Sequence, residues 1–301
     1  MKPKSILRLL FIASLIIPAA CDVKDPIYNT AHPEHGAVTL STDWSGRGEG
    51  LAVPESYTVE TGGYTATLSG ATHRLDHLFD PGTYRLRVYN TPQHVTVDGA
   101  TVTVAVATGS ADGVGQFVQE MPGWLFTSAT DITTEADTEH ACTVAMQQQV
   151  RQLTLVIEPA GGSADRIERI EGRLSGVAST LNMDNGTHAA PQNVALTFAK
   201  VTSGADAGKW SATVRLLGMA GNGQKLHATV FFKDNNPAPM PFTGTDGSEG
   251  TDLTAELATF NADKRTPLTL GGRMVETPTG AGFTAIITDW TPVDGGPVTA
   301  Q

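Results

Sequence analysis

Apolar residues alternate with threonine, serine and other polar residues in many short runs along this chain. Residues 83–89, for example, read Thr-Tyr-Arg-Leu-Arg-Val-Tyr, and glycine, proline, asparagine or aspartate separates one run from the next. This period of two is typical of antiparallel strands that place one face on a core. The other main runs are 37–43, 57–60, 64–68, 95–98, 102–106, 150–158, 193–201, 209–217, 224–233 and 282–290.

Two segments fit this pattern less well. Residues 166–174 fit a strand, although a helix is also possible there. Residues 252–260 carry the clearest helical pattern, in which Asp252 could cap the first turn. Its apolar residues would share one face: Leu253, Leu257 and Phe260. Because helical patterns are so scarce, we expect an all-β protein built from antiparallel β-sandwiches.

The first residues have the layout of a secretory signal. Residues 9–17 form an apolar run that is too short to span a membrane, and small residues then lead into Cys21. A cysteine at this place predicts cleavage just before it and lipidation of its thiol, as in bacterial lipoproteins. Pro18 stands where such signals usually have leucine, and the alternative is an ordinary cleaved signal with an incidental Cys21. The basic residues before the apolar run are Lys2, Lys4 and Arg8.

Removal of residues 1–20 would leave a strongly acidic chain. It would carry 17 basic and 31 acidic side chains, a net charge of −14. Such a charge opposes binding to nucleic acids and to anionic lipid surfaces, so we expect no nucleic-acid partner. Any membrane attachment would then depend on the lipid of Cys21.

The length and the residue pattern divide the chain into four parts. We expect a signal peptide at 1–20, a lipid-anchored tether at 21–36, an N-terminal β-sandwich at 37–146 and a C-terminal one at 147–301. The two Thr-Asp-Trp strand ends, at residues 42–44 and 288–290, fit either two related domains or a chance match.

The sequence contains no arrangement that indicates catalysis or a cofactor. It has no Gly-x-Ser-x-Gly elbow, no glycine-rich phosphate loop and no cysteine pair with metal spacing. We interpret the pair His73 and His77 as structural residues, and the acidic segment 245–252 as a solvated turn. If Cys21 carries lipid, Cys142 is the only remaining thiol, and we expect it to be a small buried residue. We therefore expect no enzyme, no metal and no cofactor.

The four tryptophans allow two interpretations. Each lies in or beside a strand-like run, so packing in a core or at an edge explains all of them. A carbohydrate-binding surface would instead need two or three exposed rings in one plane. A glycan-binding surface lipoprotein is therefore the alternative function. The four residues are Trp44, Trp124, Trp210 and Trp290.

Taken in order, several segments resemble one family of bacterial surface proteins. The chain is similar to the FimB-type minor fimbrial subunits and fimbrial anchor lipoproteins of Bacteroidales, which belong to type V pili. The resemblance extends over the whole chain after the signal, and the order of the segments carries it. These segments are Cys21 with 22–25, then 36–44, 81–90, 121–124, 151–176 and the closing strand that ends at 289–290.

The resemblance implies two transthyretin-like (immunoglobulin-like) β-sandwich domains and a role in cell adhesion. Such a protein is held in the outer membrane by lipid (palmitate) on Cys21, exposed at the surface, and acts as anchor or minor, accessory subunit of a fimbrium. Its partners are other fimbrial subunits, which it joins by β-strand exchange. The candidate residues of the exchanging strands are Val38, Leu40, Phe283 and Ile286.

Arg47 is the candidate site of proteolytic processing. It lies in the glycine-rich loop 45–50, directly after the strand-like run 37–44. The resemblance implies that polymerising subunits are cut after an early strand by an arginine-specific protease, whereas an anchor stays uncut. A cut after Arg47 would remove the strand and the lipid together. We favour the uncut anchor or accessory form.

Overall fold

The computed structural model describes residues 34–108, 116–159, 164–233, 237–239, 250–279 and 282–292. Over these ranges the protein is all-β and contains no α-helix, which confirms the predicted fold class. None of the described segments is therefore a helix that could cross a membrane. The division into domains at residue 147 stays a prediction.

A three-stranded and a five-stranded sheet surround the smaller of two cores. The three-stranded sheet has the order β11-β1-β4, and β1 (Gly36–Asp43) is its central strand. The five-stranded sheet has the order β12-β10-β5-β2-β3. The remaining bounds are β2 (Tyr57–Thr61), β3 (Tyr64–Leu68), β4 (Thr72–Phe79), β5 (Gly82–Tyr89), β10 (Phe126–Thr134), β11 (Glu139–Ala145) and β12 (Gln147–Gln148).

A larger sheet of thirteen strands contains the rest of the fold, with the main order β18-β17-β14-β15-β16-β13-β20-β21. These strands are β13 (Arg151–Pro159), β14 (Ile167–Asn182), β15 (Thr187–Lys200), β16 (Trp210–Leu216), β17 (Lys225–Phe232), β18 (Pro237–Pro239), β20 (Leu268–Thr279) and β21 (Gly282–Pro292). Outside this order lie β6 (Val95–Asp98), β7 (Thr101–Val104), β8 (Val106–Thr108), β9 (Gln116–Val118) and β19 (Thr251–Asp252).

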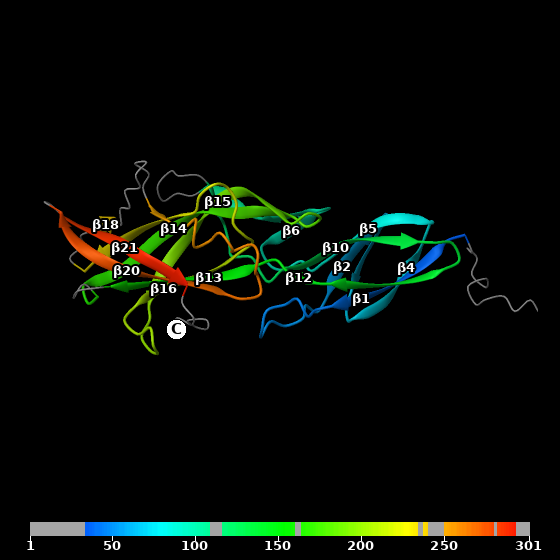
Figure 1. The fold of residues 1–301 in the computed structure, drawn as a ribbon, viewed down its shortest axis with the longest axis horizontal. Coiled ribbons are helices and arrows are strands. Elements are labelled where there is room, and N and C mark those ends of the chain that lie inside the picture. Colours follow the sequence, from blue (N-terminus) through cyan, green and yellow to red (C-terminus); the bar gives the residue numbers. More distant parts are fainter. Residues whose placement is uncertain are drawn as a thin grey trace, which may run out of the picture.

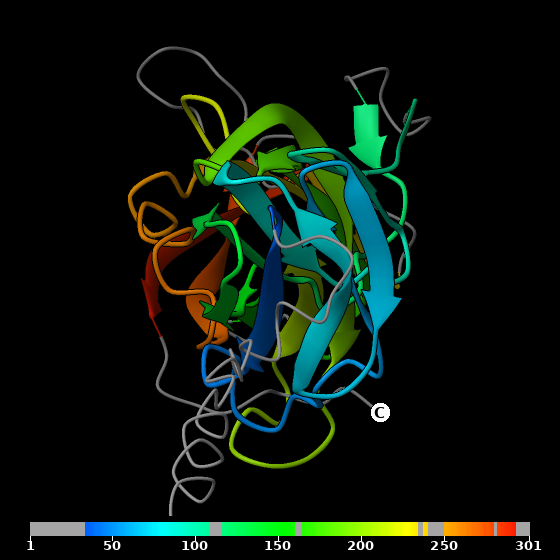
Figure 2. The ribbon, with the colours of Figure 1, turned by 90° about the vertical axis from the view of Figure 1, so that its right-hand side faces the viewer.

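The two sets of strands follow one another along the long axis of the molecule (Figure 1). Seen from one end, the blue and cyan strands of the smaller set lie in front of the larger sheet (Figure 2). Each set encloses its own cluster of buried apolar side chains, and Trp124 packs against both clusters. The end-to-end order of the two sets makes the molecule elongated, and the two cores meet at Trp124.

The strands β6 to β9 connect the two sets. All four strands lie within the predicted N-terminal domain. Nevertheless, β7 pairs with β14 and β9 pairs with β15, both of which belong to the larger sheet. The sequence pattern predicted strands at 95–98 and 102–106, but it contained no information on their distant partners. The chain thus leaves the smaller set after β5 and returns to it at β10.

Most predicted strands are present, and residues 167–174 of the segment 166–174 belong to β14 rather than to a helix. The helix expected at 252–260 is wrong. Successive turns occupy this segment, and their hydrogen bonds mostly span three residues, as from Phe260 N to Leu257 O (3.0 Å). The apolar face was nevertheless predicted correctly, because Leu253, Leu257 and Phe260 are all buried. Burial of the three side chains does not require a continuous helix.

The central position of β1 makes its apolar residues important for stability. Leu40 is fully buried, and we expect Leu40→Ala to lower the free energy of unfolding by about 2–5 kcal/mol, because a cavity would form in the smaller core. Ser41→Ala is the matched control: the Ser41 hydroxyl forms an exposed hydrogen bond with the Thr72 hydroxyl (3.0 Å), so its effect should stay within about 0.5 kcal/mol. Urea unfolding measures both, and equal effects would contradict a core role for β1.

Candidate functional site

The predicted exchange residues Val38 and Leu40 lie on β1 and are fully buried. β1 pairs in parallel with β11, where Leu40 lies opposite Cys142, and antiparallel with β4, where Leu40 lies opposite His73. Because β1 forms hydrogen bonds along both edges, its removal would leave an open slot between β4 and β11. A strand that enters such a slot can restore the backbone pairing and refill the side-chain positions.

Arg47 lies in the turn that follows β1, and its side chain stabilises this turn. Its Nε donates a hydrogen bond to the carbonyl oxygen of Leu51 (2.9 Å), and its Nη1 donates to that of Trp44 (3.3 Å). The side chain is half-buried. The guanidinium is thus directed back onto its own loop.

The next residue, Gly48, attaches this loop to more distant parts of the chain. Its buried N–H donates to Oε1 of Gln148 (2.7 Å), and Gln148 Nε2 donates to the carbonyl oxygens of Val150 and Lys264. A Cβ atom at position 48 would lie 2.6 Å from the carbonyl oxygen of Arg265, so the close approach requires glycine. The Arg47–Gly48 peptide bond is therefore held against the segment that precedes β20.

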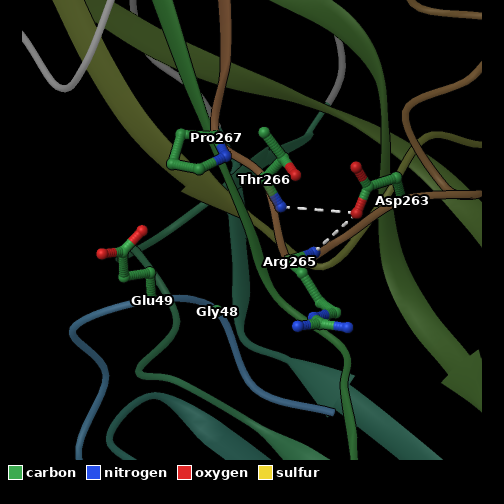
Figure 3. Close-up of a pocket in the computed structure, with 6 residues that line it drawn as sticks. All are labelled: Gly48, Glu49, Asp263, Arg265, Thr266 and Pro267. Atoms are coloured by element: carbon green, nitrogen blue, oxygen red, sulfur yellow. Dashed lines mark hydrogen bonds between the residues drawn. The ribbon is translucent and has the colours of Figure 1, made fainter.

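An open polar cavity of about 620 Å³ lies beside this contact (Figure 3). Asp263 shapes one wall, because its Oδ1 accepts hydrogen bonds from the backbone N–H groups of Arg265 (3.1 Å) and Thr266 (3.4 Å). The loop hydrogen bonds lower the pKa of Asp263 despite its partial burial. The lining residues are Gly48, Glu49, Asp263, Arg265, Thr266 and Pro267.

Lys264 is a buried basic residue behind the cavity wall. Its Nζ lies 3.1 Å from Gln149 Oε1, 2.7 Å from His188 Nε2 and 3.3 Å from the carbonyl oxygen of Leu217. Burial lowers the pKa of Lys264 to about 7. Burial and the nearby ammonium lower the pKa of His188 to about 4, so its imidazole is neutral and can accept a hydrogen bond from Lys264. Every hydrogen of the ammonium thus has an acceptor.

Arg151 also fixes the segment that precedes β20. Its Nε donates to the carbonyl oxygen of Thr266 (2.7 Å), and its Nη1 donates to that of Phe260 (3.1 Å). The guanidinium also lies 5.1 Å from the centre of the Phe260 ring. Three side chains hold the loop after β1, the connection into β13 and the segment before β20 together. We call this group the polar junction, and its residues are Gln148, Lys264 and Arg151.

The other two exchange candidates, Phe283 and Ile286, lie on β21. In the pairing with β20, Phe283 is opposite Pro278 and Ile286 is opposite Val275. Among the described strands, β21 ends the main order of the larger sheet with one edge outside any described ladder, and β18 lies near it. The two pairs of candidates thus occupy different positions: Val38 and Leu40 on a central strand, Phe283 and Ile286 on a terminal one.

The remaining candidates have structural surroundings or are not described. Cys21 and most of the acidic segment 245–252 lie outside the described residues. Cys142 is half-buried on β11, and burial raises the pKa of its thiol. His73 and His77 lie on β4. The His73 ring packs against Tyr57 and the His77 ring against Tyr64, with ring centres 6.4 and 5.5 Å apart. Among the described residues, no group of three or more His, Cys, Asp or Glu could hold a metal ion.

Comparison with known proteins identifies the family. The family model of the fimbrillin-A associated anchor proteins Mfa1 and Mfa2 matches residues 64–296, well over half of the chain. This protein belongs to the Mfa1/Mfa2 anchor family. The finding confirms the resemblance to fimbrial anchors that the sequence showed. A search of the curated proteins found no match.

Solved structures agree with this family at the level of the fold. The fimbrial anchor protein Mfa2 from Porphyromonas gingivalis is 13% identical, with a TM-score of 0.51, 89% of this chain covered and 100% of that chain. Two proteins from Bacteroides ovatus, both provisionally described as adhesins, each have a TM-score of 0.55. The first is 14% identical, and the match covers 81% of this chain and 90% of that protein. The second is 13% identical, and the match covers 87% of this chain and 96% of that protein.

Sequence reasoning did not predict the polar junction in this member of the Mfa1/Mfa2 family. Residues 147–149 served only to mark a domain boundary, and Lys264 was not singled out. Gln148 lies a hundred positions from Gly48 and more than that from Lys264, so no local pattern connects them. The available signal was a run of three glutamines between two apolar strands, where polar residues need partners once they are buried.

The polar junction should determine how readily the loop after β1 is cleaved. Gln148→Ala removes the acceptor of the Gly48 N–H, which should cost about 1–2 kcal/mol and make cleavage at the Arg47–Gly48 bond by an arginine-specific protease roughly tenfold faster. N-terminal sequencing during limited digestion measures the new terminus at Gly48. Gln152→Ala, on β13 outside the loop, is the matched control and should leave the rate unchanged. Equal rates for Gln148→Ala and the unmodified protein would contradict the role of this hydrogen bond.

Proposed function

We propose that this protein is an outer-membrane lipoprotein that serves as the anchor or a minor, accessory subunit of a type V fimbria. It is lipidated on Cys21, exposed at the cell surface through the tether 21–36, and joins partner subunits by strand exchange in cell adhesion. Membership of the Mfa1/Mfa2 anchor family supports the fimbrial role and a non-enzymatic function.

The observation that carries the anchor form is the protection of the Arg47–Gly48 bond by its own surroundings. A protease needs an accessible, extended segment, but Arg47 is hydrogen-bonded to Leu51 and Trp44, and Gly48 is buried against Gln148 and Arg265. The strand that a cut would release is also the central strand of its sheet. These contacts favour a subunit that keeps both β1 and the lipid, and thereby stays attached to the membrane.

A subunit that retains β1 has no open slot in its smaller core. Its contacts with partners would then use other strands, and β21 with Phe283 and Ile286 is the candidate, because it ends the main order of the larger sheet. An unpaired edge presents backbone N–H and C=O groups that an extended partner segment can match. This arrangement suits a terminal or accessory subunit.

The alternative, a glycan-binding lipoprotein, receives less support from the aromatic residues. Trp44, Trp210 and Trp290 are buried, as the core interpretation of the sequence predicted. Trp124 is half-buried between the two cores. The tryptophan rings are thus used in packing, and none of the four forms part of an exposed flat surface.

Capture of the protein from outer membranes of its native cell tests the function. The unmodified protein should co-purify fimbrial subunits from the membrane fraction. Cys21→Ser should abolish lipidation and shift the protein to the soluble fraction, where it should still capture the same subunits, because the tether separates Cys21 from the folded strands. Quantitative mass spectrometry of both fractions measures the outcome.

Ser14→Ala, a change within the predicted signal, is the matched control and should leave the protein in the membrane. Retention of the Cys21→Ser protein in the membrane fraction would contradict the lipid anchor. Capture without any fimbrial subunit would contradict the fimbrial function, whichever fraction is used.

A further inference from the structure

The chain passes between its two cores three times. It runs from β5, which ends at Tyr89, to β6 of the larger sheet, returns from β9 to β10, and crosses again from β12 to β13. Two domains joined by one linker usually move relative to each other. Three crossings by short segments restrict bending and twisting much more than one linker does.

The hairpin of β14 and β15 extends past the larger core to the smaller one. Near its tip, β14 pairs with β7, so that Thr180 lies opposite Thr103 and Asn182 opposite Thr101. The turn of the hairpin then presents Asp184. Asn182 Oδ1 accepts the backbone N–H of Asp184 (3.0 Å), which fixes the position of this residue.

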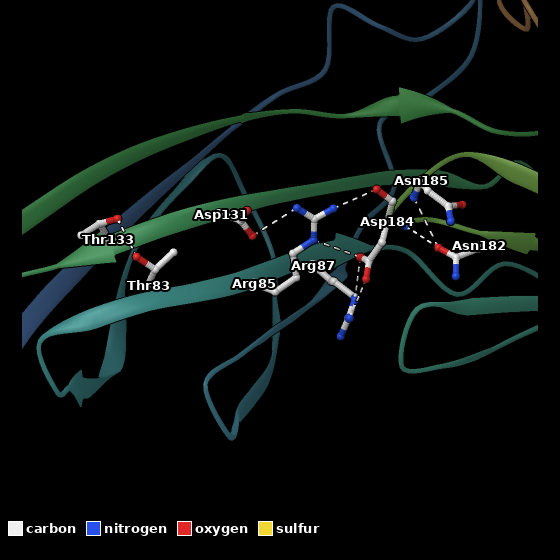
Figure 4. A network of polar contacts seen from close by, with 8 residues as sticks. All are labelled: Thr83, Arg85, Arg87, Asp131, Thr133, Asn182, Asp184 and Asn185. Atoms are coloured by element: carbon white, nitrogen blue, oxygen red, sulfur yellow. Dashed lines mark hydrogen bonds and ion pairs between the residues drawn. The ribbon is translucent and has the colours of Figure 1, made fainter.

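Asp184 forms ion pairs with two arginines of the smaller set of strands (Figure 4). Arg87 binds its carboxylate through Nε to Oδ1 (2.9 Å) and through Nη2 to Oδ2 (2.8 Å), a bidentate geometry. Arg85 donates from Nε to Oδ1 (3.1 Å) and from Nη2 to the Asp184 carbonyl oxygen (2.9 Å). Both arginines belong to β5, so one residue of the hairpin is attached to neighbouring positions of a strand in the other set.

The surrounding acidic residues hold the arginines in place. Asp131 on β10 lies 3.1 Å from Arg85 Nη1, and Glu60 on β2 lies 3.6 Å from Arg87 Nη1. The hydrogen bonds from Arg87 lower the pKa of Asp184 more than burial raises it. The carboxylate is therefore ionised at neutral pH and stays paired.

An apolar contact also joins the two cores. Trp124 packs against both cores, and the Arg215 guanidinium on β16 lies 5.7 Å from its ring centre. Asn90, which follows β5, donates from Nδ2 to the Trp124 carbonyl oxygen (2.9 Å) and accepts the N–H of Phe126 (2.7 Å). Polar and apolar contacts thus join the two cores at separate points.

We propose that the β14–β15 hairpin is a brace that makes the two cores one stiff rod, and that Asp184 is the residue that locks the brace. The brace connects the end of the molecule that carries β1 with the end that carries β21. A force applied at one end would then pass through paired strands and ion pairs rather than through a flexible linker.

Pulsed electron-electron double resonance on the full chain tests the brace. Spin labels on Thr67→Cys in β3 and Glu168→Cys in β14, both exposed positions, report the distance between the two sets of strands after Cys142→Ser removes the other described thiol. The protein with Asp184 should give one narrow distance distribution. Asp184→Ala and Asp184→Asn should broaden it about twofold, because the default for weakly joined domains is relative motion.

Asp206→Asn is the matched control. Asp206 also forms a partly buried ion pair, with Lys209 Nζ at 2.8 Å, but both residues belong to the larger set, so this variant should keep the narrow distribution. Differential scanning calorimetry gives a second readout: one transition with Asp184 and two without it. A distribution that is as narrow in Asp184→Ala as in the unmodified protein, or one that is broad already with Asp184, would overturn the proposal.

Discussion

The pairing of β1 along both of its edges is the interaction on which the smaller core depends. β4 and β11 do not pair with each other, so their sheet exists only because β1 lies between them. Its inward side chains, Val38 and Leu40 among them, fill the core beneath. Whether the protein keeps β1 therefore decides whether this half is a closed sandwich or an open one, and under the proposed function this difference separates an anchor from a polymerising subunit.

The loop that follows β1 connects this strand to the rest of the molecule. Gly48 binds Gln148, and Gln148 binds the carbonyl oxygen of Lys264, whose buried ammonium binds Gln149 and His188. Leaving any of these buried groups without a partner would cost more than a surface contact gains. Gln148 of β12 thus connects the segment that would have to open before proteolysis could release β1 to the segment that precedes β20.

Period-two alternation predicted the all-β class and most strands, since a half-buried strand needs an apolar side chain at every second position. It failed where burial follows another rule. The segment from Asp252 to Phe260 has helical spacing but forms successive turns, and β4 was missed because its charged and histidine residues obscure Leu75 and Phe79. The functional contacts of Gln148, Lys264 and Asp184 could not be predicted, because each joins residues about a hundred positions apart.

We expect the cell-associated protein to keep β1 together with lipid on Cys21. Intact-mass spectrometry of the protein purified with its fimbriae tests this claim most directly. The account predicts one species that begins at a lipid-modified Cys21 and still contains residues 37–48. A species that begins at Gly48 and carries no lipid would contradict it.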